Sequence, residues 1–398
     1  MFDAVPIHVW LIESGLQNRP VLALFEELCR RLAATPLRIE RAHLSVALLH
    51  PSLRGFSHTW TRKTDAVETQ FFTRGMDDTQ GWKVSPFKHV LENRLPNLRR
   101  RLTGNQAQLD FPVLTEFRDQ GLTDWLCCLH SFNPETGLPW SQMTGMITSW
   151  ATGAPAGFTD EDILLLEELM GTTALVVKAD TQQQIARNLL ATYVGGNSVE
   201  RVLAGEITRG GVQRIEAAIL FADLRGFTAF SDTTPIEETL TLLNAAFDAM
   251  GAPVTREGGH ILKFLGDGLM AIFPSEDNAG GACLRALAAA EAGQEAMALL
   301  NETRAAEGLP VLGLDLALHH GEVLYGNVGT TDRLDFTVVG PAVNEASRIE
   351  TLCKRLERPV LLSESFATAL GDHPGLCELG THELAGLARP RRIFGIGG

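Results

Sequence analysis

Two short stretches, each with an aspartate beside an apolar run, constrain this chain most. In residues 221–228 (FADLRGFT), Asp223 follows the mostly apolar run 215–220 and precedes a turn that contains Gly and Thr. In residues 263–273 (KFLGDGLMAIF), Asp267 stands in a Gly-Asp-Gly turn between two apolar runs. A carboxylate at the end of a buried strand is unfavourable unless its charge is paired or binds a metal. The two stretches therefore predict a divalent-metal site.

The metal hypothesis depends on both stretches, because a single aspartate at a strand end is most often a turn residue. A strand over 215–222 and a hairpin over 260–273 place Asp223 and Asp267 at one edge of an α+β sheet. Mg²⁺ is usually held by one or two carboxylates together with substrate phosphates. Two metals about 3.5–4 Å apart stabilise the attacking and leaving oxygens of a displacement. This pattern favours phosphoryl chemistry.

Further residues fit a substrate that carries phosphates. Gly226, Phe227 and Thr228 come just before a helix, where backbone N–H groups bind phosphates. Asn344 and Arg348 are spaced four apart, so they share one face of a predicted helix. Arg348 offers a rigid fork of donors for developing phosphate charge, and Asn344 suits a ribose oxygen. An Asn–Arg pair of this kind usually lies on a solvated surface. Its functional interpretation therefore depends on the presence of the two aspartates.

These motifs, in this order, resemble the catalytic domain of class III nucleotide cyclases. The resemblance covers residues 215–396 and includes residues 326–329 (GNVG) and 340–348 (GPAVNEASR). It implies a ferredoxin-like α+β fold with helices on one face of the sheet. It also implies conversion of a nucleoside triphosphate to its 3′,5′-cyclic monophosphate, with release of pyrophosphate.

The same resemblance implies roles for five residues. Asp223, Leu224 and Asp267 would be ligands of two Mg²⁺ or Mn²⁺ ions per site. Asn344 and Arg348 would act on the transition state from the other protomer of a head-to-tail dimer. Because one chain carries both sets, a homodimer would hold two equivalent sites. No residue is identified as a separate general base.

Two positions are expected to select the purine base. Lys263 and Thr337 match the purine-selecting pair of the family. A lysine donates to N1 of adenine, and a threonine hydroxyl accepts from N6. Lys263 would leave the N1–H of guanine unpaired, which costs about 1–3 kcal/mol if buried. We therefore predict ATP as the substrate. Thr337 also matches a bacterial subgroup that includes members stimulated by bicarbonate.

One segment departs from the family. Members often have a lysine near the C-terminus that contacts the β- and γ-phosphates, but residues 383–390 (ELAGLARP) have Ala385 and Leu387 there. Arg389 and Arg391 are candidates to replace it, although an arginine fork differs from a point charge. Three functions stay open: an adenylate cyclase, a guanylate cyclase, and a weak or inactive nucleotide-binding signalling protein. A diguanylate cyclase would need a Gly-Gly-Asp/Glu-Glu-Phe hairpin, which differs from the Gly-Asp-Gly turn here.

The N-terminal half has no catalytic motif. We expect a helix over 21–32, a strand pair, a helix over 85–95, a second strand pair and a long exit helix from Thr159 to Leu189. This order resembles a GAF-type α/β sensory domain with an unknown input. The exit helix favours a parallel dimer contact. In chain order we predict an N-terminal segment (1–20), a GAF-like regulatory domain (21–178), a helical linker (179–214) and a class III cyclase catalytic domain (215–398).

Composition narrows the partners. The 398-residue chain has a net charge of −14, which argues against nucleic acid or an anionic membrane. The basic run 99–101 is too short to change this and predicts a solvated surface. No apolar stretch reaches the ~20 residues of a membrane span, and no signal peptide is expected. The six cysteines have no CxxC spacing and should be buried thiols of a cytoplasmic protein.

Overall fold

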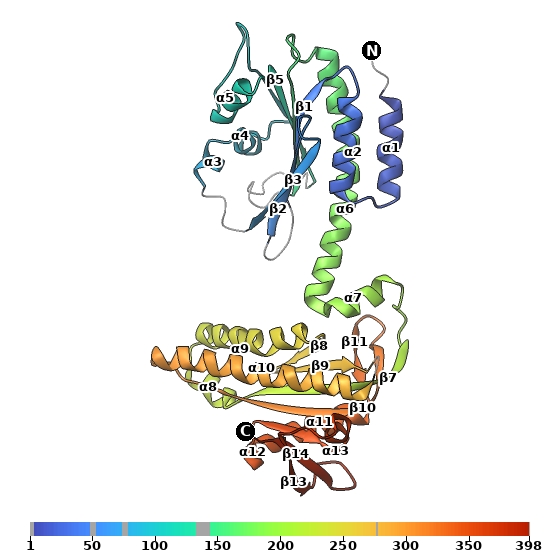
Figure 1. The fold of residues 1–398 in the computed structure, drawn as a ribbon, viewed down its shortest axis with the longest axis vertical. Coiled ribbons are helices and arrows are strands. Elements are labelled where there is room, and N and C mark those ends of the chain that lie inside the picture. Colours follow the sequence, from blue (N-terminus) through green and yellow to red (C-terminus); the bar gives the residue numbers. More distant parts are fainter. Residues whose placement is uncertain (1–3, 48–52, 74–78, 133–143, 276–277, 398) are drawn as a thin grey trace. The chain divides into compact units, whose positions relative to one another are not determined.

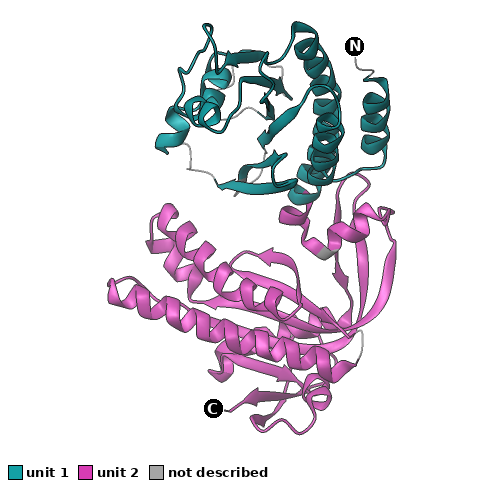
Figure 2. Cartoon of the chain, turned by 45° about the horizontal axis from the view of Figure 1, so that its top comes forward, with its two compact units in different colours: residues 1–189 teal, residues 190–398 magenta. Residues whose placement is uncertain are grey.

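The computed structural model describes residues 4–47, 53–73, 79–132, 144–275 and 278–397. The chain forms two compact units, residues 1–189 and residues 190–398 (Figures 1 and 2). None of the helices in the described ranges is both long enough and apolar enough to cross a membrane. We describe each unit separately.

The N-terminal unit is built on a six-stranded antiparallel sheet with the strand order β3-β2-β1-β6-β5-β4. Its strands are β1 (Ile39–Ala47), β2 (Leu53–Thr61), β3 (Ala66–Thr73), β4 (Asn97–Arg101), β5 (Asp124–Ser131) and β6 (Gly145–Thr152). Its helices are α1 (Val5–Leu16), α2 (Val21–Ala33), α3 (Gln80–Lys83), α4 (Pro86–Glu92), α5 (Pro112–Asp119) and most of α6 (Asp160–Val194).

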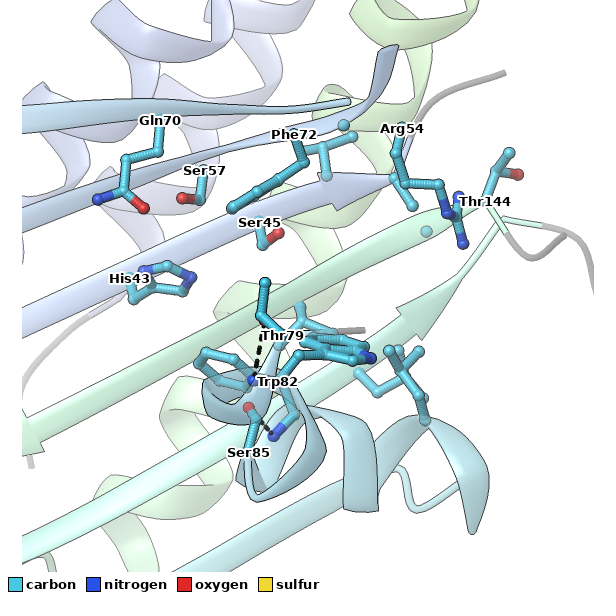
Figure 3. A pocket seen from close by; sticks show the side chains of 18 of the residues that line it. His43, Ser45, Arg54, Ser57, Gln70, Phe72, Thr79, Trp82, Ser85 and Thr144 are labelled. Atoms are coloured by element: carbon cyan, nitrogen blue, oxygen red, sulfur yellow. Dashed lines mark hydrogen bonds between the residues drawn. The ribbon is translucent and has the colours of Figure 1, made fainter. Parts of the chain in front are cut away.

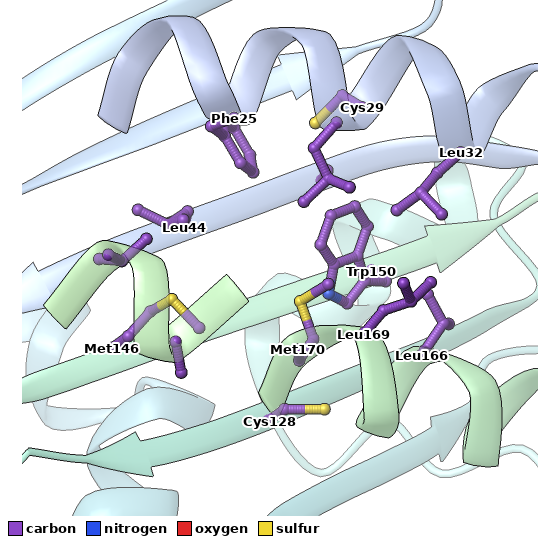
Figure 4. Close-up of a cluster of buried hydrophobic side chains, with 14 of the residues drawn as sticks. Phe25, Cys29, Leu32, Leu44, Cys128, Met146, Trp150, Leu166, Leu169 and Met170 are labelled. Atoms are coloured by element: carbon purple, nitrogen blue, oxygen red, sulfur yellow. The ribbon is translucent and has the colours of Figure 1, made fainter. Parts of the chain in front are cut away.

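One face of this sheet packs against α2 and α6. Figure 4 shows part of the core between them, with Phe25 and Cys29 from α2, Leu44 from β1, Trp150 from β6 and Met170 from α6. All five side chains are fully buried. Burying a large apolar side chain contributes about 1.5–3 kcal/mol, so this layer holds the unit together. A second, smaller core lies between the other face and α4 and α5.

Residues 4–20, which the sequence analysis assigns to an N-terminal segment, belong to the first compact unit. Helix α1 buries Ile7 and Leu11 in the main core. His8 Nδ1 lies 3.0 Å from Thr172 Oγ1 of α6, which ties the two helices together. The sequence pattern missed α1 because its apolar residues are only weakly confined to one face of the helix. Strand β3 and helix α5 were also not expected, since neither has a strong apolar pattern.

The basic run at residues 99–101 is not a solvated surface, so that prediction was wrong. Arg99 Nη2 lies 2.8 Å from Oδ2 of Asp124, whose side chain is fully buried. Arg101 Nε lies 3.6 Å from the same oxygen, and Arg100 pairs with Asp110 at 2.7 Å. The run forms β4, which pairs with β5 and so reaches the buried carboxylate. Removing one member of such a buried pair typically destabilises by about 3–5 kcal/mol.

Helix α6 begins with a capping box, an arrangement that the Thr-x-x-Asp pattern of residues 159–162 favours. The backbone N–H of Thr159 donates to Asp162 Oδ2 at 2.9 Å, and the N–H of Asp162 donates to Thr159 Oγ1 at 3.1 Å. The helix continues five residues beyond the expected end at Leu189, to Val194. It therefore passes the boundary between residues 189 and 190 without a break. Residues 133–137 (NPETG) have the composition of a turn, but they lie outside the described residues.

The C-terminal unit is built on a mixed sheet in which β7 and β10 are central. The strand order is β13-β14-β12-β10-β7-β9-β8, and β11 also pairs with β10. The strands are β7 (Val212–Arg225), β8 (His260–Leu265), β9 (Gly268–Pro274), β10 (Gly313–Gly329), β11 (Leu334–Val339), β12 (Val360–Ser363), β13 (Leu376–His382) and β14 (Arg391–Ile396). The helices are the end of α6, α7 (Gly196–Leu203), α8 (Phe227–Thr233), α9 (Ile236–Arg256), α10 (Ala279–Ala306), α11 (Pro341–Glu350), α12 (Leu352–Leu356) and α13 (Glu364–Leu370).

Helices cover both faces of this sheet, which differs from the one-sided arrangement expected from the sequence. Leu220 and Leu224 of β7 belong to the core with α9 and α10. Ile219, which points to the opposite face, packs with Ala346 of α11. Strand β7 is apolar on both sides, and a strand of this kind needs cover on each face. Asp223 lies on the α11 side of the strand, two residues from Phe221 and four from Ile219.

Two smaller expectations concern the start of α9 and the cysteines. Residues 234–237 (TPIE) have the pattern of a capping box with Pro235 as the first helical residue, but α9 begins at Ile236 and has no side-chain cap bond. The extended backbone at Thr234 and Pro235 instead separates α9 from α8. All six cysteines are free thiols, and each except Cys377 is buried, as expected.

Candidate active site

Asp223 lies within β7 rather than just beyond its end, because the strand continues to Arg225. In the β7–β10 register Asp223 is directly opposite Asp315. Like charges in this position repel each other. Arg225 offsets one of them, since its Nε donates to Asp315 Oδ2 at 3.0 Å. The Asp223 carboxylate therefore lies opposite the Asp315 carboxylate, which is already paired with Arg225.

A glycine brings the hairpin with Asp267 close to Asp223. A Cβ atom at Gly268, the first residue of β9, would lie 2.4 Å from the carbonyl oxygen of Ala222 and 3.0 Å from Asp223 Oδ1. No larger residue fits this contact. Gly268 thus lets the turn that carries Asp267 approach the Asp223 carboxylate. The sequence motif marks Gly268 as a turn residue but does not reveal this close contact.

Two carboxyl groups of this region, Asp223 and Glu350, have raised pKa values. Burial, followed by the charges of Asp267 and Asp315, raises the pKa of Asp223 to about 6. Burial, followed by the charges of Asp223, Asp315 and Asp267, raises the pKa of Glu350 to about 7. Glu350 is the last residue of α11, and no sequence motif singled it out. The region therefore carries an excess of negative charge that a cation would offset.

This set of oxygen donors fits a hard divalent cation. Mg²⁺ is typically held by one or two carboxylates plus substrate phosphates, and Asp223 and Asp267 are two such carboxylates. The side chain of Leu224 is buried in the core, so only its backbone carbonyl oxygen is available as a ligand. Within the described ranges, no group of three or more His, Cys, Asp or Glu side chains is arranged to hold a metal. Substrate phosphates would have to complete the coordination.

Gly226 is the N-cap residue between β7 and α8, and Phe227 and Thr228 are the first two residues of α8 rather than, as the sequence had suggested, residues before it. Gly226 adopts the left-handed conformation, with φ of 91°, which glycine reaches without strain. Phe227 is half-buried against the core, with its ring 6.4 Å from that of Phe230. Its side chain is therefore structural, and only its backbone N–H suits a phosphate. Thr228 is exposed.

A third residue, Asp335, connects the two predicted purine-selecting residues, Lys263 and Thr337. Lys263 Nζ lies 2.8 Å from Oδ2 of Asp335, an ion pair that lowers the pKa of Asp335. Asp335 and Thr337 are two residues apart in β11, so they share one face of that strand. Thr337 is buried, whereas Asp335 is half-exposed. Period-two spacing before Thr337 is the signal that could have identified Asp335 from the sequence.

The structure does not join Asn344 and Arg348 to Asp223 within one chain. Both side chains lie on the exposed side of α11, and neither forms a hydrogen bond or ion pair with another residue of the described ranges. The opposite side of α11 is buried through Ala342, Ala346 and Ile349. Asn344 and Arg348 are therefore presented outward.

The two candidates for the missing phosphate-binding lysine differ. Arg391 Nε lies 3.1 Å from each carboxylate oxygen of Glu345, a half-buried pair that anchors β14 to α11. Arg389 is exposed, and its side chain forms no hydrogen bond or ion pair with another described residue. Ala385 is exposed as well, and Leu387 is half-buried. Of the two arginines, Arg389 is the one whose guanidinium is available.

A comparison of this chain with known protein families agrees with the fold and with these residues. Residues 212–386 match the model of the family described as the adenylate and guanylate cyclase catalytic domain. This part of the C-terminal unit is therefore similar to the catalytic domain of nucleotide cyclases, the resemblance that the motifs around Asp223 and Asp267 indicated.

Named relatives include adenylate cyclases. The chain is 34% identical over 195 residues to "Adenylate cyclase" of Anabaena cylindrica, covering 48% of this chain and 37% of that protein. It is 30% identical over 213 residues to "Adenylate cyclase 1" of Rhizobium meliloti, covering 52% and 31%. The chain thus spans about a third of the length of these relatives. A solved structure, the adenylyl cyclase CyaB from P. aeruginosa, is 27% identical with a TM-score of 0.44, covering 47% of this chain and 96% of that one.

Proposed function

We propose that this chain is an adenylate cyclase that converts ATP to 3′,5′-cyclic AMP and pyrophosphate. The observation that carries the proposal is the approach of the Asp267 turn to the Asp223 carboxylate, which Gly268 makes possible. Their mutual repulsion and the raised pKa of Asp223 favour a divalent cation between protein and triphosphate.

In the proposed reaction the ribose 3′-hydroxyl gives its proton to water or to the substrate, its oxygen forms a bond to the α-phosphorus, and the bond from that phosphorus to pyrophosphate breaks. Two Mg²⁺ or Mn²⁺ ions held by Asp223, Asp267 and the Leu224 carbonyl oxygen would supply Lewis-acid chemistry and neutralise charge. Arg348 donates to the oxygens of the α-phosphate as charge develops on them. Asn344 orients the ribose. Positioning and charge stabilisation provide most of the catalysis in reactions of this kind.

The choice of ATP rests on Lys263. Its ammonium group donates to N1 of adenine and cannot accept the N1–H of guanine. The contact with Asp335 supports this proposal, because it holds Lys263 close to the strand of Thr337. GTP is the alternative substrate. A weak or inactive nucleotide-binding protein is the second candidate, which Ala385 and Leu387 favour because neither replaces a phosphate-binding lysine.

A homodimer would complete the site, since Asn344 and Arg348 point outward from α11. An apolar patch supports such an assembly. Ile236, Leu240 and Phe264 are more than half exposed, and the ring of Phe264 lies 4.5 Å from that of Phe247 on α9. Exposed apolar groups that gather in this way typically mark a protein interface.

We also propose that the N-terminal unit is a GAF-like sensory domain that regulates the cyclase in intracellular signalling. The order of helix α2, strands β1 and β2, helix α4, strands β5 and β6 and exit helix α6 supports this reading. Helix α6 enters both units, so it offers a continuous covalent path from sensor to catalytic domain.

The deciding experiment measures cyclic product from the purified full chain with ATP or GTP and with Mg²⁺ or Mn²⁺. We expect cyclic AMP from ATP, no product without divalent cation, and none from a folded Asp223→Ala variant. A higher rate with GTP would replace the proposal with a guanylate cyclase. No cyclic product from a folded dimer with either nucleotide would favour the nucleotide-binding protein.

A further inference from the structure

Helix α7 packs against the hairpin that β10 and β11 form (Figure 1). Val202 of α7 and Val194 at the end of α6 contact the apolar core that contains Tyr325 of β10 and Phe336 of β11. Tyr325 and Phe336 are buried, and their rings meet edge to face with centroids 4.9 Å apart. All four residues belong to the C-terminal unit. The chain that leaves α6 is therefore attached to this hairpin.

Arg201 of α7 joins the helix to both rings. Its guanidinium carbon lies 5.1 Å from the centroid of the Tyr325 ring and 5.2 Å from that of the Phe336 ring. The edge of the guanidinium is used by hydrogen bonds, since Nε donates to Glu206 Oε2 at 2.8 Å and Nη2 donates to Gln213 Oε1 at 3.2 Å. The flat face is left for the rings, and such an attraction is strongest where water is excluded. Arg201 is thus held in one position over the hairpin.

A second contact uses the GNVG motif, to which the proposed reaction gives no role. Asn327 is buried, and its side-chain Nδ2 donates to the carbonyl oxygen of Glu206 at 2.6 Å. Its backbone N–H donates to the carbonyl oxygen of Gly211 at 3.1 Å, and the N–H of Gly210 donates to the carbonyl oxygen of Asn327 at 3.0 Å. A Cβ atom at Gly326 would lie 2.2 Å from the carbonyl oxygen of Gly211, so a larger residue would prevent this approach. The motif therefore fastens the segment after α7 to β10.

The same hairpin carries two of the residues that would select the base. Phe336 lies between Asp335 and Thr337 in β11, and successive side chains of a strand point to opposite faces. Asp335 and Thr337 therefore share one face of the strand, while Phe336 is held on the other by Arg201. Asp335 in turn pairs with Lys263 at 2.8 Å. A shift of Phe336 would move both of its neighbours, because the three residues are consecutive in the backbone.

We propose that Arg201 is a positioning residue for base selection, which holds β11 in place through the rings of Tyr325 and Phe336. The inference rests on the proposed cyclase function and extends it to a residue outside the site itself. Arg201 acts on the base only through Asp335 and Thr337. Because the end of α6 packs against the same core, a movement of α6 would be passed on to the strand that selects the base.

A double-mutant cycle tests the proposal. Arg201→Gln removes the stacking cation, and Phe336→Leu removes the ring but keeps an apolar side chain. Calorimetric titration of the full chain with the α,β-methylene analogues of ATP and GTP, which cannot be cyclised, measures the preference between the two bases without turnover. Each variant should reduce this preference about threefold to fivefold, the change expected when a contact of about 0.7–1 kcal/mol is lost. The double variant should reduce it no further, because both substitutions remove the same contact.

Arg392→Gln is the matched control. The guanidinium carbon of Arg392 also lies over an aromatic ring, 5.4 Å from the centroid of Phe394, and Arg392 pairs with Glu378, but this contact is on β14 rather than β11. The control should leave the preference between the bases unchanged. Thermal unfolding checks each protein. If Arg201→Gln does not fold, Arg201→Lys replaces it, because lysine keeps the charge but lacks the flat face that stacks.

The outcomes separate this inference from the proposed function. An unchanged preference in Arg201→Gln, with or without equal losses of affinity for both analogues, would overturn the inference, as would additive effects in the double variant. Equal affinity of the natural chain for the two analogues would also overturn it. A natural chain that binds the analogues but makes no cyclic product would contradict the cyclase and leave the binding test intact. No binding of either analogue would contradict both proposals.

Discussion

The ammonium nitrogen of Lys263 lies 2.8 Å from the carboxylate of Asp335 and reaches from the β8–β9 hairpin to strand β11. This ion pair spans two segments that are far apart in the sequence. Because Thr337 shares a strand face with Asp335, the ion pair fixes the position of the Lys263 ammonium group relative to Thr337. Base selection would then depend on three residues rather than two.

Asp335→Asn tests this dependence. We expect kcat/KM for ATP to fall about threefold to fivefold, since a partly exposed ion pair contributes about 0.2–1 kcal/mol, and the preference for ATP over GTP to narrow. The measurement is kcat/KM with each nucleotide. Asp332→Asn, in the exposed turn before β11, is the control and should leave the preference unchanged. An unaltered preference in Asp335→Asn would assign selection to Lys263 and Thr337 alone.

Asp223→Asn should separate stability from activity. The raised pKa of Asp223, about 6, means that its ionised form destabilises the cation-free fold near neutral pH. Without divalent cation we expect the variant to unfold about 2–4 °C higher, which corresponds to about 1 kcal/mol after allowance for solvent screening. Mg²⁺ or Mn²⁺ should raise the melting temperature of the natural chain but not that of the variant, which should make no cyclic product. Equal stabilisation of both proteins by the cation would argue against Asp223 as a ligand.

Mixing inactive variants tests the shared site. Asp223→Ala and Arg348→Ala should each be inactive alone, and a mixture of them should recover activity, because a heterodimer keeps one complete site. The matched control mixes Asp223→Ala with Asp267→Ala, which damage the same half of the site and should not complement. Recovery in the control, or its absence in the first mixture despite verified heterodimers, would contradict a site built from two chains.

The two C-terminal arginines should behave differently. Arg389→Ala should raise KM for ATP with little change in the melting temperature, because its side chain is exposed and makes no ion pair with a described residue. Arg391→Ala should lower the melting temperature, because it removes the partner of the half-buried Glu345. Kinetics and thermal unfolding of both variants provide the comparison. An unchanged KM in Arg389→Ala would show that Arg389 does not replace the phosphate-binding lysine of the family.

Acid should destabilise the N-terminal unit through His43. Burial, with the nearby charges of Arg41 and His58, lowers the pKa of His43 in the folded chain to about 3, below the usual histidine value, so the unfolded chain binds more protons between these two pH values. The stabilising contribution is complete above about pH 6.5 and is lost as the pH falls toward 3, by at most about 1.4 kcal/mol per pH unit. Urea unfolding at several pH values measures this slope, and His43→Gln should flatten it. All six tryptophans lie in residues 1–189, so their fluorescence reports on this unit alone.

Local patterns predicted several strands of the C-terminal unit and the start of α6 well. The apolar runs around Asp223 and Asp267 predicted a strand and a hairpin, and the structure has β7, β8 and β9 there. The reciprocal hydrogen bonds of Thr159 and Asp162 follow from residues three positions apart. Features of this kind are determined by neighbouring residues, so the sequence is enough to predict them.

Contacts between distant segments were not predictable in the same way. Nothing near Arg99 in the sequence indicates the buried Asp124, and nothing near Gly268 indicates the carbonyl oxygen of Ala222. Glu350 gains its raised pKa because the fold buries it and places the end of α11 near three other carboxylates. The N-terminal unit contains a cavity of about 410 Å³ (Figure 3), and the small residues that line it on the paired strands β1 and β2 face each other only in the register of the folded sheet.

Helix α6 runs without interruption from Asp160 to Val194, past the boundary between the two units. An α-helix turns by about 100° and rises about 1.5 Å with each residue. The number of residues in α6 therefore determines the direction, about the helix axis, in which the residues at its end point. One added residue turns every later side chain by about 100° about the helix axis, whereas seven added residues return it to within about 20° of its starting direction. Insertions and deletions in this helix can thus change the direction in which later residues point without altering any residue of the proposed nucleotide site.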